Sequence, residues 1–143
     1  MSETQVITLR EAASRTHYPL DAFHFVRRGL DYTVHRAHSQ PEKLTEQERH
    51  VSGDQLSLGL RDFAIDQYGH MARTVLRRWR INRTEDFGRI VFAMVDAGLM
   101  QATESDSVRD FDGVFDLDDA MLATIPLDRV PTAGFEPDAV QQT

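Results

Sequence analysis

Histidines are the side chains in this sequence that are best suited to binding a metal ion or moving a proton near neutral pH. His35 and His38 stand three residues apart on one expected helix, and His24 lies on the same helix. A metal site needs three or four converging ligands, and the sequence contains neither a cysteine nor a His-Glu-x-x-His motif. We therefore predict no metal centre, with metal-dependent activity at an unrecognised His/Asp site as an alternative. The histidines are His17, His24, His35, His38, His50 and His70.

A second group with possible chemistry is an acidic segment over residues 104–119. The order Asp110-x-Asp112-Gly113 lacks the further ligands at fixed positions that a twelve-residue calcium loop requires. We interpret the segment as a surface that caps turns or pairs with arginines, with cation binding as the alternative. The candidate acidic face is Asp106, Asp110, Asp112 and Asp116, and its acidic neighbours are Glu104, Asp118 and Asp119.

Serine and glycine patterns indicate neither catalysis nor cofactor binding. Ser52-Gly53-Asp54 is explained by a helix cap. The sequence has no nucleophile elbow and no Gly-rich phosphate loop. It therefore predicts no catalytic residue, no cofactor-binding residue and a function other than catalysis.

An arginine-rich stretch surrounds the single tryptophan of the chain. Tryptophan and arginine are typical anchors of protein interfaces, and arginine also contacts nucleic-acid phosphates. The formal net charge of −7, together with the acidic polar positions of the helix that follows, disfavours nucleic acid. We therefore predict a non-enzymatic adaptor or regulatory module that binds another protein or forms a homodimer, with nucleic-acid binding as the alternative. The candidate interaction face is Arg73, Arg77, Arg78, Trp79, Arg80 and Arg83.

The clearest element that must position these side chains is a helix over residues 85–97. Its apolar residues recur at i, i+3, i+4, i+7 and i+8, which makes one stripe on a helix. Thr84 is the expected N-cap, and Gly98 is the expected residue just past the C-terminus. We expect this helix to be the hub of the core. The stripe consists of Phe87, Ile90, Val91, Met94 and Val95.

Further helices are predicted upstream of this hub. Thr8 with Glu11, and Ser52 with Gln55, have the spacing of capping boxes and mark two of the starts. Gly29 lies inside one of these helices, where we expect it to let another helix approach closely. The predicted ranges are 9–13, 20–37, 53–68 and 70–79.

The segments outside the helices differ in character. After Gly98 the pattern predicts a β-hairpin, with strands over residues 99–103 and 114–117 and an acidic turn between them. Asp118 is the expected cap of a final helical turn. Residues 38–51 are expected to form a polar connection.

Together these elements predict a mainly α chain, or α+β when the small C-terminal β-hairpin is counted. One architecture is a helical bundle. The other is winged-helix-like, in which the helices over 53–68, 70–79 and 85–97 precede a two-stranded wing. We expect a single domain over residues 6–122 and a flexible tail over residues 123–143.

Five motifs stand out along the chain: His50-Val51-Ser52-Gly53-Asp54-Gln55-Leu56, Tyr68-Gly69-His70-Met71-Ala72, Val75-Leu76-Arg77-Arg78-Trp79, Thr84-Glu85-Asp86-Phe87-Gly88-Arg89-Ile90-Val91-Phe92 and Asp106-Ser107-Val108-Arg109-Asp110-Phe111. With Tyr18, Ala22-Phe23, Phe25-Val26, Leu30 and Thr33 they resemble an uncharacterised family of small bacterial proteins known mainly from planctomycetes and verrucomicrobia. The resemblance covers about residues 16–120 and implies no activity, because the family has none assigned. Arg80 departs from the family pattern, which has glycine after the tryptophan, and this departure bears only on the shape of the turn into Thr84.

Composition is that of an ordinary globular domain. The chain has 143 residues, of which 41% are hydrophobic and 27% charged. The lack of cysteine excludes a disulfide framework and fits a reducing compartment. Because the sequence shows neither an apolar leader nor a membrane span, it predicts a cytoplasmic protein without membrane contact.

Overall fold

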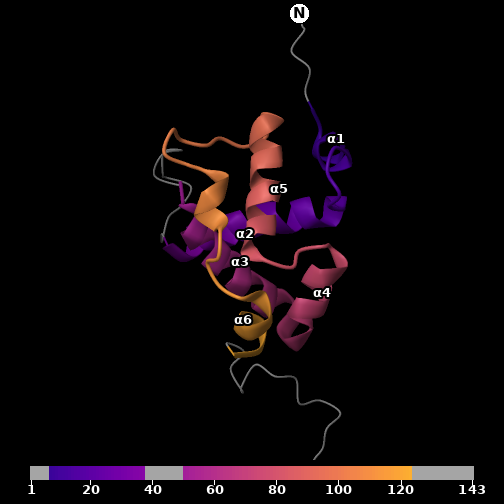
Figure 1. The fold of residues 1–143 in the computed structure, drawn as a ribbon, viewed down its shortest axis with the longest axis vertical. Coiled ribbons are helices and arrows are strands. Elements are labelled where there is room, and N and C mark those ends of the chain that lie inside the picture. Colours follow the sequence, from indigo (N-terminus) through magenta and orange to yellow (C-terminus); the bar gives the residue numbers. More distant parts are fainter. Residues whose placement is uncertain (1–6, 38–49, 124–143) are drawn as a thin grey trace, which may run out of the picture.

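The computed structural model describes residues 7–37 and 50–123, and this part of the chain is mainly helical, as predicted. Figure 1 shows α5 crossing α2 near the centre of the molecule, with α1 towards one end and α4 and α6 towards the other. The elements are α1 (Leu9–Ser14), α2 (Leu20–Ala37), α3 (Gly53–Tyr68), the 3-10 turn η2 (Gly69–Met71), α4 (Ala72–Arg78), α5 (Thr84–Asp96), the 3-10 turn η3 (Val108–Phe111) and α6 (Leu117–Ala123).

The two predicted capping boxes are confirmed. Before α1, the Glu11 backbone N–H donates to Thr8 Oγ1 at 3.1 Å, and the Thr8 N–H donates back to Glu11 Oε1 at 3.1 Å. Before α3, the Gln55 N–H donates to Ser52 Oγ at 3.3 Å, and the Ser52 N–H donates to Gln55 Oε1 at 3.0 Å. These bonds satisfy backbone donors that have no partner inside the helix, and so fix where each helix begins.

The hub helix α5 begins differently from the prediction. Thr84 is its first helical residue and is buried, so it is not the N-cap. The capping acceptor is instead the Asp86 carboxylate, whose Oδ2 accepts from the backbone N–H groups of Asn82 at 2.8 Å and Arg83 at 3.1 Å. Thr84 Oγ1 accepts from the distant Val114 N–H at 3.2 Å. Thr84, which the sequence predicted to be the N-cap, thus connects the chain after η3 to the start of α5.

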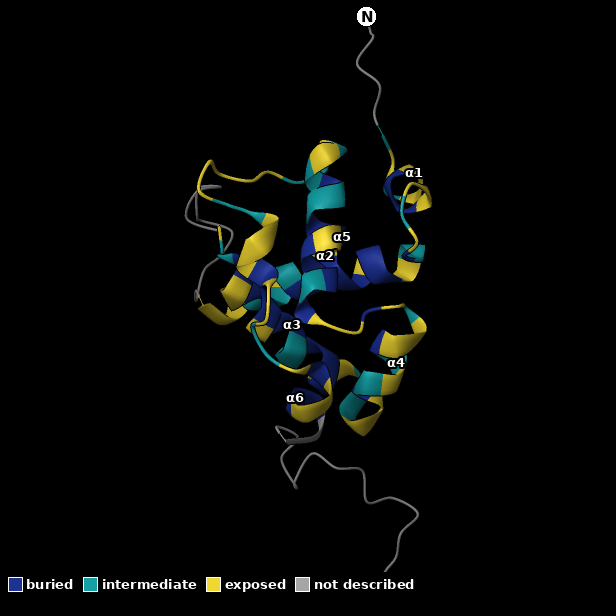
Figure 2. Ribbon diagram, viewed as in Figure 1, coloured by how far each residue is buried: buried dark blue, intermediate teal, exposed yellow. Residues whose placement is uncertain are grey.

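The end of α5 and its apolar face agree with the prediction. Gly98 has a φ of +77°, the left-handed conformation that glycine adopts without strain. Its N–H donates to the Val95 carbonyl at 3.0 Å, and the Leu99 N–H donates to the Met94 carbonyl at 2.8 Å. Figure 2 shows the buried parts of α2, α3 and α5 turned towards the centre. The fully buried side chains there include Phe23, Phe25, Val26, Leu60, Phe87, Ile90 and Met94.

Two glycines bring α2 and α3 close together. A Cβ atom at Gly29 would lie 2.2 Å from Leu60 Cδ2, which confirms the close approach expected at this position. On the facing helix, a Cβ atom at Gly59 would lie 1.9 Å from Thr33 Oγ1. Each helix therefore leaves room for a side chain of the other.

The predicted C-terminal β-hairpin is wrong, because the described residues contain no strand. Where the hairpin was expected, polar side chains cap short helices. The Asp110 carboxylate accepts from the Ser107 N–H at 3.0 Å at the start of η3, and Asp116 Oδ1 accepts from the Asp119 N–H at 3.0 Å at the start of α6. Asp116, and not Asp118, therefore caps the final helix.

Other sequence predictions fall outside the described residues. These are most of the connection over 38–51 and all of the tail beyond Ala123. In the ranges 7–37 and 50–123, no helix combines the length and apolar character needed to cross a membrane.

Candidate binding site

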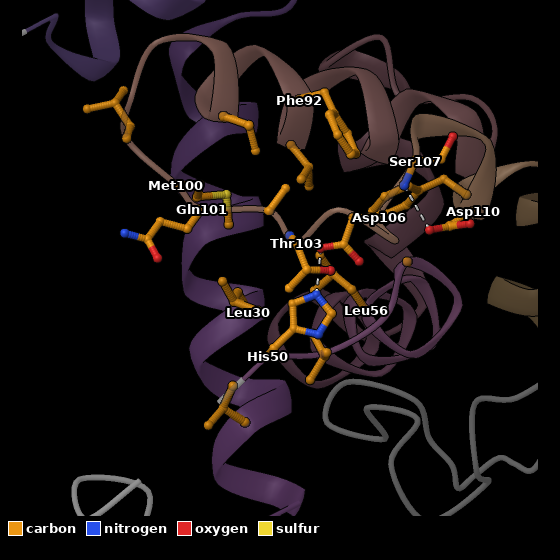
Figure 3. A pocket seen from close by; sticks show the side chains of 18 of the residues that line it. Leu30, His50, Leu56, Phe92, Met100, Gln101, Thr103, Asp106, Ser107 and Asp110 are labelled. Atoms are coloured by element: carbon orange, nitrogen blue, oxygen red, sulfur yellow. Dashed lines mark hydrogen bonds and ion pairs between the residues drawn. The ribbon is translucent and has the colours of Figure 1, made fainter. Parts of the chain in front are cut away.

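A groove of about 930 Å³ lies between α2, α5 and the segment formed by residues 98–107. The α5 helix ends at Asp96, and from Gly98 the chain runs on without regular structure to Ser107. This segment forms one side of the groove, and α2 with the start of α3 forms the other (Figure 3). Its apolar lining includes Leu30, Val34, Val51, Leu56, Val91, Phe92, Val95, Leu99, Met100, Ala102 and Phe111.

The apolar lining is only partly covered by the described protein. Val34 and Leu56 are buried, whereas Leu30, Val95 and Met100 are half-buried. Apolar surface in contact with water costs about 25 cal/mol per Å² relative to burial. The groove is therefore a place where a bound apolar group would gain free energy.

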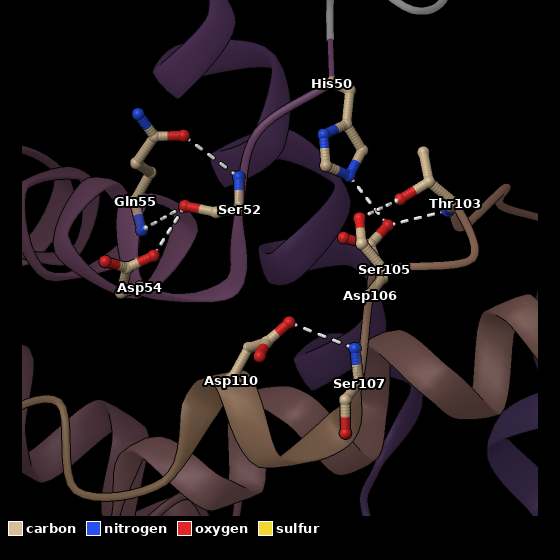
Figure 4. Close-up of polar contacts among 9 residues, drawn as sticks. All are labelled: His50, Ser52, Asp54, Gln55, Thr103, Ser105, Asp106, Ser107 and Asp110. Atoms are coloured by element: carbon tan, nitrogen blue, oxygen red, sulfur yellow. Dashed lines mark hydrogen bonds and ion pairs between the residues drawn. The ribbon is translucent and has the colours of Figure 1, made fainter.

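A histidine–aspartate pair lies at the edge of this groove. His50 Nε2 lies 2.7 Å from Asp106 Oδ2, and the Thr103 backbone N–H donates to the same oxygen at 2.7 Å (Figures 3 and 4). Burial raises the pKa of the Asp106 carboxyl, but the hydrogen bonds from Thr103 and His50 outweigh this effect and hold the pKa below its usual value. The pair therefore connects His50, which directly precedes Val51, to the segment of residues 98–107 that forms the opposite wall of the groove.

Next to the pair is a second, more polar hollow that Asp54, Asp106, Asp110 and Asp112 line. The Ser52 hydroxyl donates to Asp54 Oδ1 at 2.5 Å and lowers the pKa of that carboxyl (Figure 4). In the part of the chain that the structure describes, no three histidine or acidic side chains are grouped so that they could hold a metal ion. Of the predicted acidic face, the structure brings together Asp106, Asp110 and Asp112.

The predicted interaction face around the tryptophan is divided between structural and exposed side chains. Arg73 is mostly covered and donates to Asp118 Oδ1 at 2.5 Å, to the Ile81 carbonyl and to Asn82 Oδ1. Trp79 is half-buried, with its ring 5.4 Å from that of Phe25. The exposed members are Arg77, Arg78, Arg80 and Arg83.

Arg80 has a backbone conformation that glycine normally adopts. Its φ is +67°, and it is the described non-glycine residue with a positive φ. The Arg80 N–H donates to the Arg77 carbonyl and the Ile81 N–H to the Leu76 carbonyl, each at 2.9 Å, which is a Schellman motif. A left-handed conformation costs a non-glycine residue about 1–2 kcal/mol. Arg80 is therefore a strained arginine in an otherwise regular helix end.

The groove is the feature that the sequence did not reveal. Its walls come from α2, α5 and residues 98–107, which are far apart in the chain. The sequence feature that could have indicated the groove is the pair Leu99 and Met100, two large apolar residues directly after Gly98. The sequence pattern predicts a strand for both.

The sequence matches no protein-family model, and it is similar to no curated protein and to no solved structure. Membership of the uncharacterised bacterial family therefore stays a prediction.

Proposed function

We propose that this protein is a non-enzymatic protein–protein interaction module and that its contact site is the groove between α2, α5 and residues 98–107. The observation that carries this proposal is the half-buried apolar lining of an open groove of about 930 Å³. The fully buried core of a protein interface is more apolar than the rest of the surface and is surrounded by a polar rim. Amphipathic segments of partner proteins bind such grooves through apolar side chains spaced one helical turn apart.

The groove replaces the tryptophan face as the preferred contact site. Trp79 is half-buried, and its ring packs against Phe25 and, edge-on, against Tyr68 at 6.0 Å. It is the one apolar member of the predicted face, whereas the core of an interface buries several apolar side chains together. Val95, Leu99 and Met100 are all half-buried and line one groove. We place the module in the cytoplasm, in keeping with the absence of cysteine.

The proposal predicts that Val95→Arg strongly reduces capture of the partner. An arginine there would put a charge against the apolar lining, so the partner bound to tagged protein from the host should fall by about tenfold or more, which corresponds to about 1.4 kcal/mol. Met100→Arg, on the non-helical wall, should have the same effect. Quantitative mass spectrometry of the bound fraction measures the loss.

Met71→Arg is the matched control, because Met71 is 49% exposed and does not line the groove. Thermal unfolding monitored by circular dichroism establishes that all three variants are folded. A partner that is retained equally by the wild type and by both groove variants would contradict the proposal. So would the absence of any stoichiometric protein partner.

A second candidate function is the binding of nucleic-acid backbone by Arg77, Arg78, Arg80 and Arg83. The observation that favours it is the strained Arg80, because strain in an exposed residue is often retained for function. Among the described residues, Arg78, Arg80 and Arg83 form no ion pair, whereas Arg77 lies 4.0 Å from Asp118. The winged-helix-like interpretation adds no support, since its wing was the hairpin that the described residues lack.

One variant tests this second function through two opposite effects. Arg80→Gly should raise the free energy of unfolding by about 0.5–1 kcal/mol, because the relief of about 1–2 kcal/mol of strain exceeds the extra chain entropy of glycine. The same variant should weaken binding to mixed-sequence DNA and lower the salt dependence by about one phosphate contact. Urea unfolding and fluorescence anisotropy measure the two effects.

Arg27→Ala is the control for charge, because Arg27 is exposed on α2, outside the predicted face. Equal losses of DNA affinity in Arg80→Gly and Arg27→Ala would show non-specific attraction and would refute this second function. A wild-type protein that does not bind DNA even at low salt would also refute it.

A further inference from the structure

Among the described residues, the charged side chains that line the groove are all of one sign. Four carboxylates line it, and none of the lining residues in the ranges 7–37 and 50–123 is a lysine or an arginine. Asp31 is contributed by α2, and the others come from the opposite wall and η3. Two histidines, His35 and His50, complete the ionisable lining. The carboxylates are Asp31, Glu104, Asp106 and Asp110.

These carboxylates differ in whether the fold already uses them. Asp106 accepts hydrogen bonds from His50 and Thr103, and Asp110 accepts one from the Ser107 N–H. By contrast, Asp31 and Glu104 are exposed, and neither carboxylate accepts a hydrogen bond or forms an ion pair among the described residues. Two carboxylates on opposite walls are thus available to an occupant of the groove.

We infer that the occupant is a basic amphipathic helix of a partner protein. This inference rests on the proposed function and names the chemical class of the partner. The apolar face of such a helix buries the half-exposed lining of the groove, and its flanking lysines or arginines pair with Asp31 and Glu104. An acidic occupant would instead meet like charges from both walls.

The charge of the whole chain acts in the same direction. The formal net charge of −7 attracts basic partners at long range and repels acidic ones, which favours encounter with a basic helix. Nucleic acid is a poor occupant for the same reason. Complementary charge at the rim would select the partner, and burial of the apolar lining would supply most of the affinity.

The test uses three synthetic peptides with the purified full-length protein. The first is a helix of about four turns, with leucine at i, i+3, i+4 and i+7 and lysine at the flanking positions. The second replaces the lysines by glutamate, and the third replaces the leucines by alanine. We expect the lysine peptide to bind about tenfold more tightly than the glutamate peptide at low salt, and the alanine peptide not to bind measurably.

Charge reversal at the rim provides the decisive comparison. The double variant Asp31→Lys/Glu104→Lys should lose the preference for the lysine peptide or reverse it. The control Asp21→Lys/Asp119→Lys makes the same change of net charge at exposed positions outside the groove lining. This control should keep the wild-type preference. Fluorescence anisotropy with each labelled peptide gives the affinities.

Three results would overturn the inference. The first is equal binding of the lysine and glutamate peptides by the wild type. The second is an equal change of preference in the rim and control variants, because this would assign the effect to net charge. The third is a concentration-dependent dimer in sedimentation that Val95→Arg dissolves, because a second copy would then be the occupant.

The outcomes also separate this inference from the proposed function. If Val95→Arg loses the host partner while the peptides show no charge preference, the groove binds protein but its partner is not a basic helix. If Val95→Arg keeps the host partner and the leucine and alanine peptides bind alike, the groove itself is not the contact site.

Discussion

Replacement of Gly59 by alanine is expected to lower the free energy of unfolding by about 2 kcal/mol. The new Cβ atom would lie 1.9 Å from Thr33 Oγ1 and 2.8 Å from Thr33 Cβ. Thr33 Oγ1 donates to the Gly29 carbonyl at 2.7 Å, so the threonine cannot turn away without losing this bond. Overpacking of this kind costs about 1–3 kcal/mol or more, and the better helix propensity of alanine returns about 1 kcal/mol. Urea unfolding measures the change.

Two comparisons identify the cause of this loss. Gly29→Ala should cost less, because its Cβ atom meets the movable end of the Leu60 side chain at 2.2 Å and not a Cβ atom next to the backbone. Thr33→Ala should make Gly59→Ala less costly by about 1 kcal/mol in a double-mutant cycle, since it removes two of the three clashing atoms. Equal costs of Gly59→Ala in both backgrounds would show that contact with Thr33 is not responsible.

The same pair of glycines shows how far local sequence patterns reach. Gly29 was recognisable because glycine is unfavourable inside a helix and calls for a reason. Gly59 lies inside α3 in the same way, but its role depends on Thr33 of another helix. Helix positions follow from local spacing and caps, whereas close contact between helices depends on residues that are distant in sequence.

The segment after α5 failed as a prediction for a related reason. Val114, Phe115 and Leu117 have side chains that suit a strand, but a strand also needs a partner for its backbone. Here the Val114 N–H donates to Thr84 Oγ1, and Asp116 caps the helix that begins at Leu117 by accepting from the Asp119 N–H. Leu117 is buried at the start of α6. The groove could not be predicted, because it forms only when residues 98–107 lie against α2 and α5 in the folded protein.

One long-range contact also explains why only part of the candidate interaction face is exposed. Sequence alone placed Arg73 with its neighbours, since all of them lie in one basic stretch. In the structure, Arg73 forms an ion pair with Asp118 of α6, and the Arg73 side chain is only 14% exposed. The remaining exposed arginines lie towards the end of α4 and in the following turn.

The second large effect is expected for Asp86→Ala, which should lower the free energy of unfolding by about 3 kcal/mol or more. The Asp86 side chain is 8% exposed and accepts from Tyr18 Oη at 2.5 Å and from Arg89 Nη1 at 2.8 Å. It also accepts from the backbone N–H groups of Asn82 and Arg83. Alanine would leave the buried Tyr18 hydroxyl and two helix-start donors without an acceptor. Asp86→Asn should cost less, because one amide oxygen remains to accept from these backbone donors.

The same contact predicts a loss of stability in alkali. Burial, and the hydrogen bond that Tyr18 donates to the negative Asp86, raise the pKa of Tyr18 to about 12. Below its ordinary pKa of 10.0 the phenol is protonated in both states, so the full stabilisation is present. As the pH rises from 10 towards 12, the unfolded chain releases this proton while the folded protein keeps it, and stability falls by up to about 1.4 kcal/mol per pH unit.

Tyr18→Phe should be less stable than the wild type near neutral pH, but its stability should fall less steeply above pH 10. Urea unfolding at a series of pH values measures both slopes. The loss of stability at low pH is a weaker test of this contact, because several carboxyls contribute to it. The pKa of Asp86 is held below its usual value, because its hydrogen bonds outweigh the effect of burial, so its contribution is present above about pH 4 and is lost as the pH falls through the folded pKa. The carboxyls of Asp62, Asp106 and Asp118 have lowered pKa values too and add to this acid loss. Above pH 10, by contrast, equal slopes of stability against pH for the wild type and Tyr18→Phe would show that the Tyr18–Asp86 contact does not stabilise the fold in the way the geometry indicates.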